Sequence, residues 1–73
     1  MENNHAGERL LRLKSVCERT GLSRSTIYLM MSQNSFPKPV AVGLRGRAWV
    51  NSEVSAWIQA RIEQSRGPKD STK

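Results

Sequence analysis

Apolar residues recur with helical spacing most clearly between residues 24 and 33. The apolar positions there are Ile27, Met30 and Met31. Because they fall three and four residues apart, they form one apolar face and predict a helix over this stretch. Ser23 comes directly before it and is expected to be its N-cap, since a serine oxygen can accept from a free backbone N–H. The polar, proline-containing sequence NSFPKP that follows cannot continue a helix.

A group of apolar residues nearer the start of the chain predicts an earlier helix. Its members are Leu10, Leu11, Leu13, Val16 and Cys17. The leucines predict a short strand or the passage from a strand into a helix, and the last two residues follow at helical spacing. Gly21 is expected to end this helix, because glycine takes the left-handed conformation after a last turn at low cost.

Two short β-prone runs, residues 40–42 and 48–50, flank the sequence GLRGR. Such runs on either side of a glycine-containing loop predict a β-hairpin. Arg45 and Arg47 are expected at its tip.

The last part of the chain returns to helical spacing. Its apolar positions are Val54, Trp57, Ile58 and Ile62. Asn51 is expected to cap this third helix, with Glu53 in the first turn favoured by the helix dipole, and Gly67 and Pro68 are expected to end it. Trp49 and Trp57 are expected in the core, with each indole N–H bonded to a local partner.

The predicted order is helix, tight turn, helix, hairpin, helix. Two helices joined by a short glycine turn form a helix-turn-helix unit. We therefore predict one α+β domain, mostly α, over residues 9–66: a small winged helix-turn-helix with three helices and a short β-hairpin wing. Residues 1–8 and 67–73 are polar and are expected to be disordered tails.

The net charge of +6 is unevenly placed along the chain. Residues 19–52 contain five bases and no acid, whereas acids and bases cancel in residues 1–18 and nearly cancel after residue 52. Net charge alone favours solubility as much as binding. An acid-free basic segment that coincides with a helix-turn-helix predicts a polyanionic partner, with double-stranded DNA the first candidate.

The start of the second helix carries the first group of candidate DNA contacts. They are Ser23, Arg24, Ser25, Thr26, Tyr28 and Ser32. The free N–H groups and partial positive charge of a helix N-terminus suit phosphate, and an arginine there can also reach a guanine edge in the major groove. The competing interpretation is a capping serine followed by an ordinary solvated face.

A second group of candidate contacts lies in and before the hairpin: Lys38, Arg45 and Arg47. On a projecting loop these cations can bind the phosphate backbone or enter a minor groove. The competing interpretation is a surface turn whose arginines only keep the protein soluble.

Other classes of function are weighed against DNA binding. In a protein-interaction module, Leu29, Met30 and Met31 would form an exposed patch for another subunit or RNA polymerase. Single-stranded RNA binding needs aromatic stacking platforms, and the chain has only four aromatic residues. An enzyme is not expected, because the sequence has no paired carboxylates, no histidine near a nucleophile and no phosphate-binding loop.

Cofactors, metal ions and small-molecule ligands are not expected either. Cys17 has no second cysteine and no nearby histidine, so we interpret it as a small core residue. No apolar run is long enough for a membrane span and the start of the chain does not resemble a secretory leader, so a cytoplasmic protein without a membrane partner is expected.

The sequence resembles the AlpA-type regulators of phages and prophages over roughly residues 9–62. The most specific matches are TGLSRSTIY, FPKPV, and an AW pair followed by SEV and W. The family is similar to excisionases and to the DNA-binding domain of MerR-type regulators, which have a winged-helix arrangement. The resemblance implies a sequence-specific DNA-binding regulator of a prophage. It would activate integrase or excisionase genes or act as an architectural excision factor, and copies of it could associate side by side on DNA.

The resemblance also implies which residues contact DNA. Residues 23–26 and Tyr28 match the start of the recognition helix, and Arg45 and Arg47 match the wing. The chain departs from the family pattern at Leu29, near which members often carry a basic or polar residue. Base contacts are therefore expected to concentrate at the N-terminal end of the helix.

Overall fold

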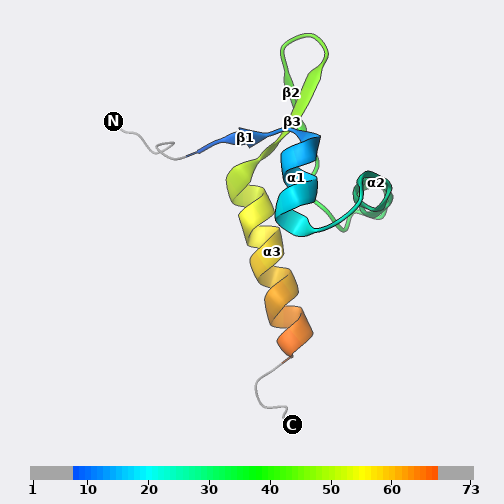
Figure 1. Ribbon diagram of the computed structural model, residues 1–73, viewed down its shortest axis with the longest axis vertical. Helices are drawn as coiled ribbons and strands as arrows, with labels where there is room; N and C mark the ends of the chain where they lie inside the picture. The colour runs from blue at the N-terminus through cyan, green and yellow to red at the C-terminus, as the bar shows by residue number, and fades with distance from the viewer. Residues whose placement is uncertain (1–7, 68–73) are drawn as a thin grey trace.

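The computed structural model describes residues 8–67, drawn in colour in Figure 1. The two tails expected from composition lie outside the described residues, except for Glu8 and Gly67 at their inner ends. The described residues form six elements: β1 (Leu10–Leu11), α1 (Leu13–Thr20), α2 (Arg24–Ser32), β2 (Val40–Val42), β3 (Gly46–Val50) and α3 (Asn51–Arg66). The prediction of an α+β, mostly α, winged helix-turn-helix is confirmed.

The hairpin and the first strand form one small antiparallel sheet. Its strand order is β1-β3-β2, so β3 is central. Leu11 lies opposite Trp49 on one side of β3, and Val42 lies opposite Gly46 on the other. The hairpin projects from one end of the molecule, the C-terminal half of α3 projects from the other, and α2 lies to one side (Figure 1).

A tight turn joins α1 to α2, as the sequence predicts. Gly21 has a φ of 78°, and its N–H donates to the Cys17 carbonyl oxygen at 2.8 Å. The Thr20 hydroxyl donates to the Val16 carbonyl oxygen and accepts from the Leu22 N–H. These bonds fix the direction in which α2 leaves the turn, and α2 is seen along its axis in Figure 1 while α1 stands upright.

We expect Gly21→Ala to lower the free energy of unfolding by about 1–2 kcal/mol, because an L side chain is unfavourable in the left-handed region. A Cβ at this position would meet no atom within 4 Å, so the loss is due to the backbone alone. Urea unfolding measures it. Gly21→Asn is the matched control and should lose less, since asparagine tolerates this conformation better. Equal stability of wild type and Gly21→Ala would contradict the turn geometry.

The core is a small apolar cluster beneath the sheet and between the helices. Its buried members are Leu11, Val16, Ile27, Phe36, Trp49 and Val54. Cys17, Met30 and Met31 are partly buried and pack against it, as expected from their spacing. Ile27 is fully buried, so the apolar face of α2 points inward and the opposite face points outward.

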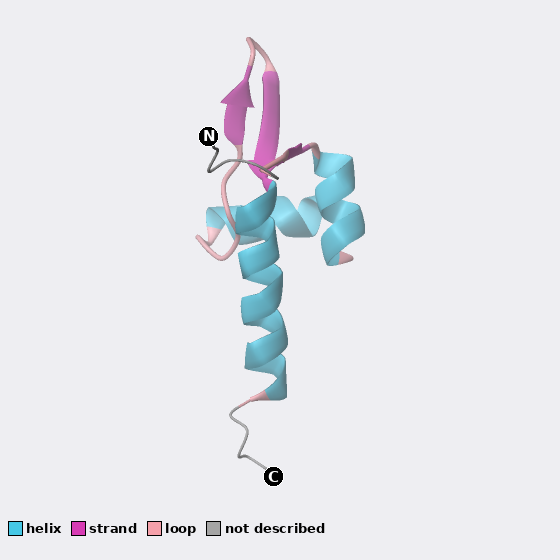
Figure 2. Cartoon of the chain, turned by 90° about the vertical axis from the view of Figure 1, so that its left-hand side faces the viewer, coloured by secondary structure: helices cyan, strands magenta, loops and turns pink. Residues whose placement is uncertain are grey.

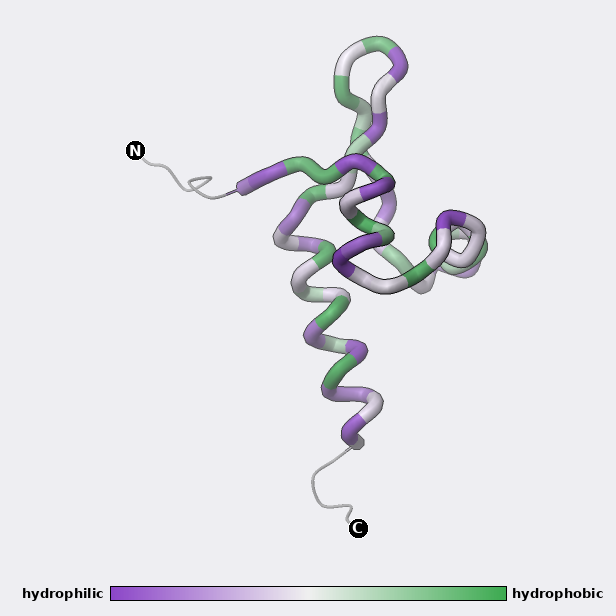
Figure 3. The backbone as a smooth tube through the Cα atoms, in the orientation of Figure 1, coloured by the Kyte–Doolittle hydropathy of each residue, from purple (hydrophilic) through white to green (hydrophobic). Residues whose placement is uncertain are grey.

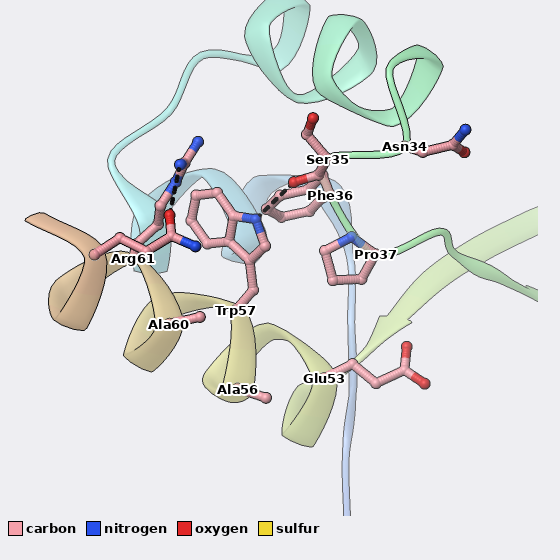
Figure 4. Close-up of a pocket in the computed structure, with 10 residues that line it drawn as sticks. Asn34, Ser35, Phe36, Pro37, Glu53, Ala56, Trp57, Ala60 and Arg61 are labelled. Atoms are coloured by element: carbon pink, nitrogen blue, oxygen red, sulfur yellow. Dashed lines mark hydrogen bonds between the residues drawn. The ribbon is translucent and has the colours of Figure 1, made fainter.

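The two tryptophans differ in burial. Trp49 is buried and its indole N–H donates to the Pro37 carbonyl oxygen at 2.9 Å. Trp57 is only half-buried, so its assignment to the core is correct in part; its N–H donates to the Ser35 carbonyl oxygen at 2.7 Å. Figure 4 shows Trp57 between Phe36 and the Arg61 side chain, in a groove between α3 and the loop before β2. Both tryptophans therefore tie that loop to the domain.

The start of α3 differs from the prediction. Asn51 is the first helical residue rather than the cap, and Val50 occupies the cap position without a side-chain bond. The carboxylate of Glu8 supplies the missing acceptors, because the Ser52 N–H and hydroxyl donate to it at 3.3 and 3.0 Å. The Asn51 side-chain oxygen instead accepts from Arg19 at 2.8 Å. Residues distant in sequence therefore supply the hydrogen-bond partners of the polar groups at the start of α3.

The far end of α3 extends past the core. Figure 2 shows its C-terminal half projecting below the other elements. Ile62, predicted on the apolar stripe, is accordingly 36% exposed. Apolar and polar residues alternate along this part of the helix (Figure 3), and Gly67 follows its last residue as predicted.

Candidate nucleic-acid interface

The N-terminus of α2 is built by the cap that the sequence predicts. The Ser23 side chain accepts from the Thr26 N–H at 3.2 Å and donates to the Thr26 hydroxyl at 2.9 Å. The hydroxyl of Ser25 lies 3.4 Å from that of Ser23. The first backbone N–H groups of any α-helix have no carbonyl partner within it. In this chain those groups are surrounded by short hydroxyl side chains, which allow a large anion to approach closely.

The outer face of α2 is exposed as predicted. Arg24, Ser25, Tyr28 and Ser32 are all exposed, whereas Thr26 is half-buried beside the cap. Tyr28 has 49% of its surface accessible. The Ser32 hydroxyl is turned back to the helix, since it donates to the Leu29 carbonyl oxygen at 2.6 Å.

The proposed protein-binding patch of Leu29, Met30 and Met31 does not form. Both methionines pack against the core, and only Leu29 is exposed, at 56%. Single exposed leucines are common on soluble proteins, so this residue alone is no protein-interaction surface.

The hairpin loop comprises the three residues between the paired Val42 and Gly46. Gly43 has a φ of 71°, Leu44 is fully exposed, and Arg45 completes the turn.

Only one of the two hairpin arginines is at the tip. Arg47 lies in β3, paired with Ala41, because β3 begins at Gly46, two residues earlier than predicted. Its side chain is still exposed. Lys38 is exposed in the loop that leads into β2.

A further cation lies at the hairpin that the sequence did not indicate. A Cβ added to Gly46 would be 3.1 and 3.3 Å from the terminal nitrogens of Arg12, so this guanidinium lies against the hairpin strand. Charge patterning along the sequence does not single out Arg12, because it belongs to the first 18 residues, in which acids and bases cancel. Position 46 requires glycine for a different reason, because the same Cβ would lie only 2.6 Å from the backbone carbonyl oxygen of Val42.

Four cations of the acid-free segment are unpaired in the part of the chain that the structure describes: Arg24, Lys38, Arg45 and Arg47. Arg19 is different, because it donates to the side chains of Asn51 and Ser55 and so holds α1 to α3. The remaining four side chains keep their positive charge exposed on α2, on the hairpin and on the loop before it.

Residues 8–67 hold neither a metal-binding cluster nor a membrane-spanning helix. No group of three or more histidine, cysteine, aspartate or glutamate side chains is arranged there to hold a metal ion. No described helix is both long and apolar enough to cross a membrane.

Comparison with known proteins points to a phage-associated family. Residues 9–62 match the family described as prophage CP4-57 regulatory protein (AlpA). The chain is 34% identical over 67 residues to the DNA-binding transcriptional activator AlpA of Escherichia coli K12, covering 84% of this chain and 96% of that protein. It is 47% identical over 55 residues to the uncharacterized protein ORF88 of Enterobacteria phage P4, covering 75% of this chain and 62% of that protein.

Proposed function

Since this chain belongs to the AlpA family of prophage regulatory proteins, we propose that it is a transcription regulator that binds a specific sequence of double-stranded DNA. The observation that carries the proposal is the set of unpaired cations on α2 and the hairpin of a helix-turn-helix domain. Exposed cations from a sequence segment that contains no acid, placed on such a fold, are the electrostatic footprint of a duplex-binding protein.

In the proposed complex, α2 enters the major groove with its N-terminus leading. The N-terminal N–H groups and the hydroxyls of Ser25 and Thr26 bind phosphate, and Tyr28 contacts the backbone further along. Ser23 and Ser32 contribute to this surface after their hydroxyls turn from their partners within the helix to phosphate. Arg24 is the one side chain on α2 that can make two parallel hydrogen bonds to the O6 and N7 atoms of guanine. It therefore reads a base, while its neighbours set the position of the helix.

The hairpin binds the flanking backbone in this proposal. Arg45 at the tip and Arg47 in β3 approach the phosphates, with Lys38 near the base of the hairpin and Arg12 beside Gly46 adding positive charge. The relatives support a regulatory role in a prophage, either as an activator of integrase or excisionase genes or as an architectural factor in excision. Self-association on adjacent sites is part of the same proposal.

Selection of bound duplexes from a random pool tests this function directly. We expect one motif to be enriched, and the protein to bind it at least a thousandfold more tightly than random DNA at physiological salt, in the usual range of specific regulators. A failure to enrich any motif, combined with no affinity for duplex DNA at low salt, would refute the proposal.

We expect Arg45→Ala and Arg47→Ala each to reduce the slope of log K against log salt concentration by up to about 0.9, because each phosphate contact releases condensed counterions. Binding titrations at several salt concentrations measure the slope. Arg66→Ala is the matched control, since it removes an exposed arginine from the far end of α3 and should leave the slope unchanged. Unchanged slopes in both hairpin variants would remove the hairpin from the interface.

A further inference from the structure

We propose that Leu29 reads the 5-methyl group of a thymine in the major groove and is thereby a specificity-determining residue of this chain. This inference rests on the proposed DNA binding by α2. It assigns a role to the one apolar side chain that the helix exposes near the middle of its outer face.

The geometry of α2 makes Leu29 prominent. Successive residues of an α-helix are about 100° apart, so Leu29 lies nearly opposite Ile27, which is fully buried. Three of the four residues one turn away on the same face are short, namely Ser25, Thr26 and Ser32; the fourth, Gln33, follows the last residue of α2. The leucine therefore stands above its neighbours and has 56% of its surface exposed.

The hydroxyl groups on either side of Leu29 lie close to other polar atoms of the helix and are therefore less available to bind base edges. The Ser32 hydroxyl donates to the Leu29 carbonyl oxygen at 2.6 Å, and the Ser25 hydroxyl lies 3.4 Å from that of Ser23. Arg24 is more than one turn nearer the N-terminus. Gln33 lies one turn nearer the C-terminus, beyond the last residue of α2. If α2 lies in the major groove, Leu29 is therefore the side chain in the middle of this face that can meet a base.

The chemistry of the major groove then selects the base. Thymine presents a methyl group there, whereas adenine, guanine and cytosine have no methyl group and are distinguished by their hydrogen-bonding groups. A leucine pressed against the polar edges would displace their water without replacing its hydrogen bonds, which is unfavourable. Against the thymine methyl it buries apolar surface on both sides. Leu29 therefore favours thymine and disfavours the other three bases at its position.

Replacing each thymine of the selected duplex in turn by deoxyuridine tests this inference, because the exchange deletes one methyl group and keeps the base pair. For the wild-type protein we expect one position at which uracil weakens binding about fourfold, the amount expected for one buried carbon group. Leu29→Ala should bind the thymine duplex more weakly than wild type does. When uracil replaces the thymine at that position, the affinity of this variant should fall by less than twofold. Circular dichroism checks that both proteins are equally helical.

The matched control is Leu10→Ala, which removes a leucine of similar exposure, 50%, from β1. It should keep the full wild-type response to uracil. The same uracil response in Leu29→Ala as in wild type would overturn the inference. So would a wild-type protein that binds its motif specifically yet responds to uracil at no position, and in that case the proposed function would stand. Absence of any specific duplex binding would refute both.

Discussion

Trp49→Ala is expected to lower the free energy of unfolding by about 3–5 kcal/mol, which is a large share of the stability of a domain this small. Domains have only about 0.05–0.15 kcal/mol of stability per residue, so the free energy of unfolding of a chain of 73 residues is small. Trp49 lies on the central strand opposite Leu11 and is buried in the core. Its loss would leave a cavity that the sheet and helices cannot close.

The hydrogen bond of Trp49 adds a second, smaller effect. Its indole N–H donates to the Pro37 carbonyl oxygen and so ties the loop before β2 to β3. Trp49→Phe keeps most of the ring but leaves this carbonyl without its donor, and should cost about 1–3 kcal/mol. Urea unfolding followed by circular dichroism measures both variants. A loss below about 1 kcal/mol in Trp49→Ala would show that this residue is not the centre of the core.

Arg24→Ala should weaken binding to the selected DNA motif by about 1–3 kcal/mol, which is roughly a five- to 150-fold loss of affinity. The reason is that a bidentate arginine–guanine pair supplies both affinity and discrimination. Arg24 is exposed at the first position of α2 and has no partner among the described residues, so its removal leaves no buried group unsatisfied. The stability of the fold should therefore stay unchanged.

The comparison with random DNA decides what Arg24 does. Binding of Arg24→Ala to random duplexes should fall much less than binding to the motif. Arg66→Ala is again the control, since it removes the same charge from the end of α3. An equal loss on motif and random DNA would show that Arg24 contacts only phosphate.

The local features of the fold could be predicted from sequence because their causes are local. Gly21 ends α1 in the left-handed conformation, and the Ser23 cap needs only the N–H three residues later. The first and second helices and the hairpin follow from spacing and turn residues. The strand boundary at Gly46 was missed, because ladder pairing uses backbone groups that glycine and arginine supply as well as valine does.

The remaining errors come from contacts between distant residues. Asn51 looked like a cap, but Glu8 and Arg19 bring their own groups to the start of α3. Ile62 has the right spacing for the core, but the core ends before α3 does. In the candidate interface, Arg12 was missed because only the fold brings it to Gly46. Periodicity indicates which face of a helix is apolar; it does not indicate where its neighbours stop.

The central claim is that α2 and the hairpin bind one DNA duplex together. Titration of the ¹⁵N-labelled protein with the selected duplex, followed by NMR, tests it most directly. We predict that amide signals of residues 24–32 and 43–47 shift along one common binding curve, while those of the last two turns of α3 stay in place. Shifts centred on α3, or shifts of α2 without the hairpin, would contradict it.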